Sequence, residues 1–311
     1  MSFMPDRNTL PAEHPLFPTA SATMNKTTLR LILLLNFFIP LTISVQAQEM
    51  LPSVERCKKL SQTSPINNIW VDEENIKWVS NGEGLHKVYG LDLVQKVSIP
   101  AGMTNLLTIR GGNANIEWST SAMASLLGTA VISSASYDPK TKSLWIGTQD
   151  EGAYQISLSP LKVIQRFNMA NKKLTSNQIN DIFIHDNGTI WIATDDGMLA
   201  GNGDKWTLHE RFLNFVGVDA WGTNMWILGD DFLWQVDTKG KWTPIAMELK
   251  NLEGKLRDIA VDDKGRVWIA SNMMTGFDVA ASRYQRFGPG QYFTSQYVNC
   301  LDVDQDGSIW T

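Results

Sequence analysis

Tryptophan recurs along this chain inside short segments that have the pattern of a tight β-hairpin. The two clearest copies read DNGTIWIAT at residues 186–194 and DKGRVWIAS at residues 263–271. The repeated positions are Trp78, Trp118, Trp145, Trp191, Trp226, Trp268 and Trp310. Their near-regular spacing indicates an architecture that repeats one small structural unit side by side.

Each copy shows the same order of secondary-structure signals. An alternating apolar segment such as residues 182–184 comes first and has the period-two pattern of a half-buried strand. A turn follows at Gly188, Gly265, Gly307 or Asn75, because these residue types adopt a positive φ at low cost. Two further strand segments complete the unit in the better copies. Four short antiparallel strands per unit of about forty residues are typical of a β-propeller blade.

The sequence therefore predicts an all-β protein in which residues 64–311 form a β-propeller of about seven four-stranded blades. The last blade is expected to be incomplete, because Thr311 falls within a strand that other copies continue. The seven tryptophans, with Gly188, Gly265 and Gly307, are the predicted structural residues of the repeat. Each indole ring would fill the wedge between neighbouring sheets and contribute roughly 2–3 kcal/mol by burial.

Composition narrows the class of protein. Apolar residues make up 43% of the sequence and charged residues 19%, which suits a packed core and is too little charge for a disordered chain. The net charge is −5, and no run of lysine or arginine is interleaved with aromatic residues. Nucleic acid is therefore not an expected partner.

The N-terminal segment has the pattern of an export signal. Residues 24–30 are basic, residues 31–45 are apolar, and Val45-Gln46-Ala47 is a small-residue cleavage site. We expect residues 24–47 to be a signal peptide, residues 1–23 to be a non-native upstream extension and residues 48–63 to be a linker. An uncleaved membrane anchor is the alternative. The mature protein is expected to be exported to the periplasm, with no membrane span.

The two cysteines, Cys57 and Cys300, would then lie in an oxidising compartment. In a closed ring, Cys57 before the first blade would neighbour Cys300 at the entry to the last, so a disulfide between them is possible. Two separate thiols are the alternative, with Cys300 at a small strand position that Asp181 and Asp258 occupy in sister repeats.

The repeat resembles the two-component regulator propeller repeat. The resemblance is carried by residues 178–198, by SLWIGT at residues 143–148 and by residues 297–311, in an Asn-x-Ile strand, an Asp-x-x-Gly turn and an Ile-Trp-Ile-Gly-Thr strand. It covers about residues 64–311, with degenerate copies at Trp118 and Trp226.

This resemblance implies a sensory protein. Proteins with such repeats are similar to the periplasmic half of hybrid histidine-kinase sensors, many of which are thought to detect glycan fragments. We therefore expect this chain to be the N-terminal fragment of a longer sensor, with the missing C-terminal part of the same sensor as its partner. Any kinase activity would reside in that downstream sequence.

Candidate sites are few. Asp302, Asp304 and Asp306 have the spacing of the start of a calcium-binding loop, but a solvated strand entering its turn also explains them. The histidines His86, His185 and His209 are scattered over different repeats, and no nucleophile or phosphate-loop motif occurs. We therefore assign no catalytic, cofactor-binding or metal-binding residue.

A ligand is expected at the mouth of the central channel, where loops converge. The candidate ligand-binding residues are Trp221, Tyr284, Tyr292 and Tyr297, because aromatic faces stack on sugar rings. The leading hypothesis is a non-catalytic, periplasmic propeller that recognises a small molecule or oligosaccharide. A propeller enzyme of the lyase type and a propeller component of an outer-membrane secretion apparatus are the alternatives.

Overall fold

The computed structural model describes residues 66–96 and 125–311, except for residues 73, 82–83, 91–92, 172, 246–251, 253 and 289–294. All of these residues belong to one compact unit, residues 51–311. The expected upstream extension, signal peptide and linker lie outside the described residues, as do Cys57, Trp118 and Tyr292.

Most of the described residues form antiparallel sheets of four strands in chain order. The first sheet contains β1 (Ile66–Val71), β2 (Lys77–Asn81), β3 (Gly84–Tyr89) and β4 (Leu93–Lys96). The second contains β5 (Ile132–Asp138), β6 (Ser143–Thr148), β7 (Ala153–Leu158) and β8 (Leu161–Phe167). The third contains β9 (Ile179–Ile184), β10 (Ile190–Thr194), β11 (Gly197–Asn202) and β12 (Lys205–His209).

Two further four-stranded sheets follow. The fourth sheet contains β13 (Phe215–Trp221), β14 (Asn224–Gly229), β15 (Leu233–Val236) and β16 (Trp242–Pro244). The fifth contains β17 (Asp258–Val261), β18 (Val267–Ala270), β19 (Met274–Asp278) and β20 (Arg283–Phe287). A two-stranded sheet of β21 (Asp302–Val303) and β22 (Ile309–Trp310) comes last.

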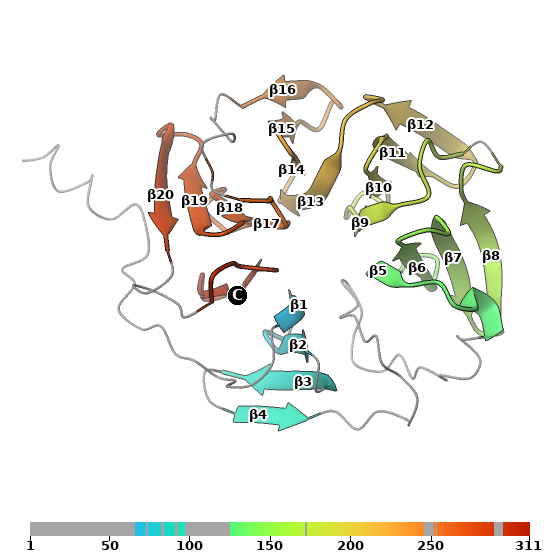
Figure 1. Ribbon diagram of the computed structural model, residues 1–311, viewed down its shortest axis with the longest axis horizontal. Helices are drawn as coiled ribbons and strands as arrows, with labels where there is room; N and C mark the ends of the chain where they lie inside the picture. Colours follow the sequence, from blue (N-terminus) through green and yellow to red (C-terminus); the bar gives the residue numbers. More distant parts are fainter. Residues whose placement is uncertain are drawn as a thin grey trace, which may run out of the picture. The chain divides into compact units, whose positions relative to one another are not determined.

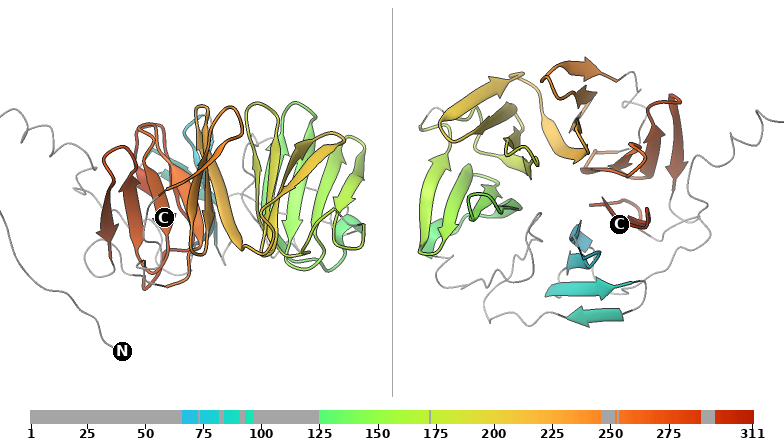
Figure 2. Two further views of the ribbon diagram at one scale, coloured as in Figure 1. Left: turned by 90° about the horizontal axis from the view of Figure 1, so that it is seen from above. Right: turned by 180° about the vertical axis from the view of Figure 1, so that it is seen from behind.

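The sheets are arranged around a common centre (Figure 1). In each sheet the first strand lies innermost and the chain crosses from the outermost strand to the innermost strand of the next sheet. Seen from the side, the sheets stand next to one another like the blades of a fan (Figure 2). The unit is therefore a β-propeller, which confirms the predicted all-β fold class.

The number of blades differs from the prediction. Within the described residues there are five four-stranded blades rather than seven, and β21–β22 forms a sheet of two strands. The blade expected around Trp118 lies outside the described residues. Counting tryptophans predicts the positions of repeats, but it does not show that every copy forms four strands.

The repeat tryptophans of the second strands occupy the wedges between blades. Trp145 packs between the second and third sheets, Trp191 between the third and fourth, Trp226 between the fourth and fifth, and Trp268 between the fifth sheet and β21–β22. All four indole rings are buried. Apolar contact between neighbouring blades therefore depends on the same repeat position each time.

Carboxylates on the inner strands add a second link between blades. In each case one oxygen accepts a hydrogen bond from a backbone N–H at or next to the inner strand of the following blade. The pairs are Asp181 with Val218 (3.0 Å), Asp219 with Val261 (2.7 Å), Asp258 with Leu301 (2.9 Å) and Asp302 with Val71 (2.8 Å). The last pair joins β21 to β1 and closes the ring.

The hairpin turns explain why aspartate and tryptophan recur six residues apart. In three copies one carboxylate oxygen accepts the indole N–H and the other accepts backbone N–H groups of the turn. The indole pairs are Asp72 with Trp78 (2.8 Å), Asp262 with Trp268 (3.0 Å) and Asp304 with Trp310 (2.8 Å). Asn75, Gly188, Gly265 and Gly307 have φ of 61°, 91°, 72° and 77°, as the turn pattern predicts.

A buried ion pair lies at the closure of the ring. The Lys77 ammonium of β2 is 3.0 Å from a carboxylate oxygen of Asp304, in the β21–β22 turn, and both side chains are 1% exposed. The same ammonium lies 4.9 Å from the centre of the Trp310 ring. In the part of the chain that the structure describes, no helix is both long enough and apolar enough to span a membrane.

A candidate ligand site at the centre of the propeller

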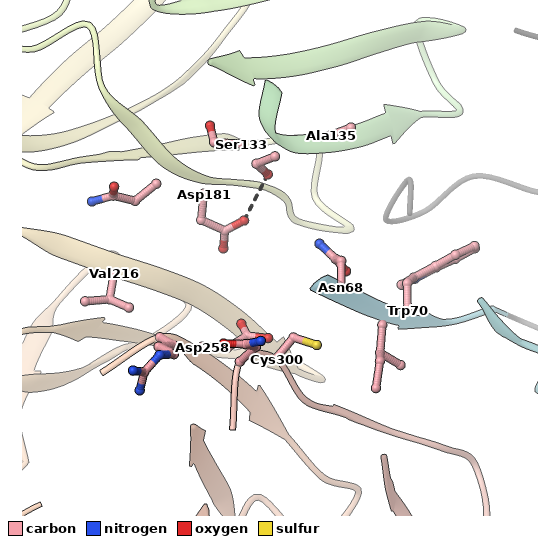
Figure 3. Close-up of a pocket in the computed structure, with 13 residues that line it drawn as sticks. Asn68, Trp70, Ser133, Ala135, Asp181, Val216, Asp258 and Cys300 are labelled. Carbon is pink, nitrogen blue, oxygen red and sulfur yellow. Dashed lines mark hydrogen bonds between the residues drawn. The ribbon is translucent and has the colours of Figure 1, made fainter. Parts of the chain in front are cut away.

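A cavity of about 140 Å³ lies where the inner strands begin. Its wall is built from the first residues of β1, β5, β9, β13 and β17 and from the residues just before β21. Figure 3 shows Asn68 and Trp70 on one side of this cavity and Asp181 and Val216 on another. Because every blade contributes its inner strand in the same orientation, equivalent repeat positions meet at this end of the channel.

One repeat position supplies much of the polar wall. The residues eleven positions before Trp145, Trp191, Trp268 and Trp310 all line the cavity, and they are Ser134, Asn180, Arg257 and Asn299. None of these four was among the residues predicted to bind a ligand. The signal that would have found them is a polar side chain recurring at a fixed distance before the repeat tryptophan.

Several of the polar side chains also hold the ring together. The Asn180 amide donates to the Phe215 carbonyl of the next blade (2.7 Å), and the Asn299 amide donates to the Ile66 carbonyl (3.0 Å). The Ser134 hydroxyl donates to Asp181 (3.2 Å), as the dashed line in Figure 3 shows. The cavity is thus a rigid frame, since its lining residues are bonded across blade boundaries.

Other polar groups at the cavity remain available. The Ser133 hydroxyl is buried and has no hydrogen-bond partner in the described structure. A buried polar atom without a partner costs free energy, so such an atom in a cavity points to a water or a ligand. The Arg257 guanidinium is half-buried and donates to the Lys255 carbonyl through one nitrogen (2.9 Å). The cavity therefore offers hydrogen-bond donors to a small polar group.

Cys300 lines the cavity but has no features of a nucleophile. Burial raises the pKa of its thiol well above the ordinary value, and the charges of Asp258 and Asp302 raise it further. The thiol therefore stays protonated at neutral pH, whereas nucleophilic cysteines have a lowered pKa. It is a free thiol in the structure, and its possible disulfide partner Cys57 lies outside the described residues.

The aromatic residues predicted to bind a ligand are not gathered in one place. Tyr297 is 41% exposed and stacks on Arg257, with 4.9 Å between the guanidinium carbon and the ring centre, so it lies beside the cavity. Trp221 is 50% exposed but ends β13, at the opposite end of the inner strand from Val216. Tyr284 is exposed on the outermost strand β20, and Tyr292 lies outside the described residues.

The residues considered for metal binding or catalysis are engaged elsewhere. Asp302 and Asp304 accept the bonds described above, and Asp306 accepts from the Asn75 amide (3.3 Å). His185 lies in a hairpin turn, and His209 on β12 stacks between two tryptophan rings. Burial lowers the pKa of His209, an effect that Glu210 partly offsets. Among the described residues, no group of three or more potential ligands could hold a metal ion.

Comparison with known proteins agrees with this class of propeller. Residues 173–196, which span the β9–β10 hairpin, match the family model described as two component regulator propeller. The resemblance inferred from the sequence is confirmed for this repeat. No curated protein matches the chain significantly.

Solved structures share the fold at low sequence identity. The extracellular domain of a putative hybrid two-component system from B. thetaiotaomicron is 16% identical, with a TM-score of 0.63 over 82% of this chain. The chain spans 38% of the length of that domain. Virginiamycin B lyase from Staphylococcus aureus is 10% identical, with a TM-score of 0.60 over 80% of this chain and 92% of the lyase.

Proposed function

We propose that this chain is a non-catalytic, ligand-recognising propeller of an exported two-component sensor, and that its ligand binds in the central cavity. The observation that carries the proposal is the polar cavity at the start of the inner strands, where an unpartnered buried hydroxyl and a half-buried guanidinium meet. The matching regulator repeat and the fold shared with a two-component extracellular domain support the sensor role.

The ligand proposed is a small polyhydroxylated molecule, such as an oligosaccharide fragment. Amide, hydroxyl and guanidinium groups line the cavity, and these are the groups that bind hydroxyl-rich ligands by hydrogen bonding. Trp70 in the wall and Tyr297 beside it provide aromatic faces. The rest of the sensor would read the bound state, and we propose the periplasm as the compartment.

A lyase is the second candidate, because virginiamycin B lyase has the same fold over most of both chains. The chemistry of the cavity favours binding instead. None of His86, His185 and His209 is among the residues that line it, and its one thiol has a raised pKa. Acid–base catalysis requires a titratable group within hydrogen-bond reach of the substrate.

Calorimetric titration of the full chain with oligosaccharides of glucose, galactose, mannose, arabinose, xylose and galacturonate tests the proposal. At least one series should bind, and Ser133→Phe, which fills the cavity, should abolish that binding while the protein stays folded by circular dichroism. Asn299→Ala is a milder second variant and should weaken binding. Trp221→Ala, at the other end of the channel, is the matched control and should bind like the wild type. Absence of binding, or unchanged binding by Ser133→Phe, would refute the proposal.

A further inference from the structure

We infer that the ligand of this cavity carries an acid group, and that Arg257 binds it. The inference rests on the proposed function and narrows its ligand to a carboxylate-bearing class, such as a uronate. It is carried by the unused hydrogen-bonding capacity of Arg257, by its fixed position and by the absence of a protein carboxylate paired with it among the described residues.

Arg257 is held in place without being saturated. Its guanidinium stacks on Tyr297, and one nitrogen donates to the Lys255 carbonyl at 2.9 Å. An arginine side chain has five N–H donors, and the other four have no partner within the described part of the chain. Stacking and one bond fix the plane of the group, which is the arrangement that binds a carboxylate through two parallel bonds.

The comparison with the equivalent residues shows that Arg257 has another role. At the same repeat position, Asn180 and Asn299 donate to a carbonyl of the next blade. Among the described residues, the Arg257 side chain donates to no backbone carbonyl of the following inner strand. A short amide is sufficient for the structural bond, so the longer cationic side chain is unexplained by the closure of the ring.

The carboxylates nearest in sequence and space are already engaged. One oxygen of Asp258 accepts from the Leu301 N–H and the other from the Ile259 N–H, both at 2.9 Å. Asp181 accepts from the Val218 N–H and from Ser134. These carboxylates are oriented by the backbone of neighbouring blades and not by Arg257, so an acid group on the ligand would supply its missing partner. The Ser133 hydroxyl would then serve a neutral part of the same ligand.

Matched pairs of ligands test this inference with the full chain. Titrations with oligogalacturonates and with their methyl esters compare the same sugars with and without charge. The wild type should bind the acids more tightly, and Arg257→Gln should weaken acid binding by about 10- to 100-fold while leaving ester binding unchanged. Arg257→Lys keeps the charge but not the fork and should recover part of the loss.

Arg211→Gln is the control, because Arg211 also stacks on an exposed aromatic ring, that of Phe212, but does not line the cavity. Free galacturonate and citrate form a separate arm. If these bind with the same dependence on Arg257, the acid group is confirmed and its source is a small organic acid. If neutral oligosaccharides bind and Arg257→Gln is without effect on any ligand, the inference is overturned while the proposed function stands. If nothing binds, both fail.

Discussion

The closure of the ring provides the sharpest prediction about stability. Lys77 on β2 and Asp304 in the β21–β22 turn form an ion pair at 3.0 Å with both side chains 1% exposed. Lys77→Met removes the positive charge and keeps most of the volume. The Asp304 carboxylate would then stay buried at the boundary between the first and last sheets without its cationic partner.

The magnitude follows from what Asp304 retains. Breaking a buried ion pair by removing one partner typically costs roughly 3–5 kcal/mol, because an uncompensated charge is left behind. In Lys77→Met, Asp304 still accepts bonds from the Trp310 indole and from the backbone N–H groups of Ser308 and Asp306. We therefore expect the lower end, about 3 kcal/mol, which corresponds to a fall in Tm of roughly 6–12 °C for a domain of this size.

Equilibrium unfolding in urea, followed by tryptophan fluorescence, measures this loss. Lys87→Met is the matched control, because Lys87 also lies over a tryptophan ring, 4.2 Å from the centre of Trp78, but is only partly buried and makes no ion pair in the described structure. The control should change the free energy of unfolding by less than about 1 kcal/mol. A Lys77→Met protein within about 0.5 kcal/mol of the wild type would refute the assigned role of the ion pair.

Three further predictions concern the same ring. Gly147→Ala should destabilise by about 1–3 kcal/mol in thermal unfolding, because a Cβ there would lie 2.5 Å from Cγ2 of Ile179 in the next blade; an unchanged Tm would contradict the packing. Asp219→Ala should cost about 1–3 kcal/mol in urea unfolding, since the buried Val261 N–H loses its acceptor, and a neutral effect would count against the links between blades. Burial alone raises the pKa of Asp304, but hydrogen bonds from Trp310 and Lys77 and the Lys77 charge outweigh it and lower the pKa. Its contribution should therefore be complete above about pH 4 and be lost as the pH falls through the folded pKa, and wild type minus Asp304→Asn should show this in unfolding free energies measured against pH.

The fold could be predicted because its signals are local. The turn residues before each tryptophan, such as Asn75 and Gly265, and the alternating inner strands depend only on neighbouring residues. The links between blades could not be predicted in the same way. Nothing near Lys77 in the sequence points to Asp304, and their contact exists only because the ring brings the first and last sheets together.

The candidate site was predicted less well than the fold. The channel mouth was named as the place, but the search favoured exposed aromatic residues, of which only Tyr297 lies beside the cavity among those described. The polar wall comes from a repeat position at the start of each inner strand. Its residue type varies from Ser134 to Asn180 to Arg257, so it has no motif, and its meaning appears only when equivalent positions converge on one axis.

A crystal structure of the full chain with a bound oligosaccharide or uronate tests the central claim most directly. The account predicts that the ligand lies in the cavity, within hydrogen-bond distance of the Ser133 hydroxyl and with an acid group against Arg257. A ligand bound instead at the Trp221 end of the channel, or on the outermost strand beside Tyr284, would contradict it.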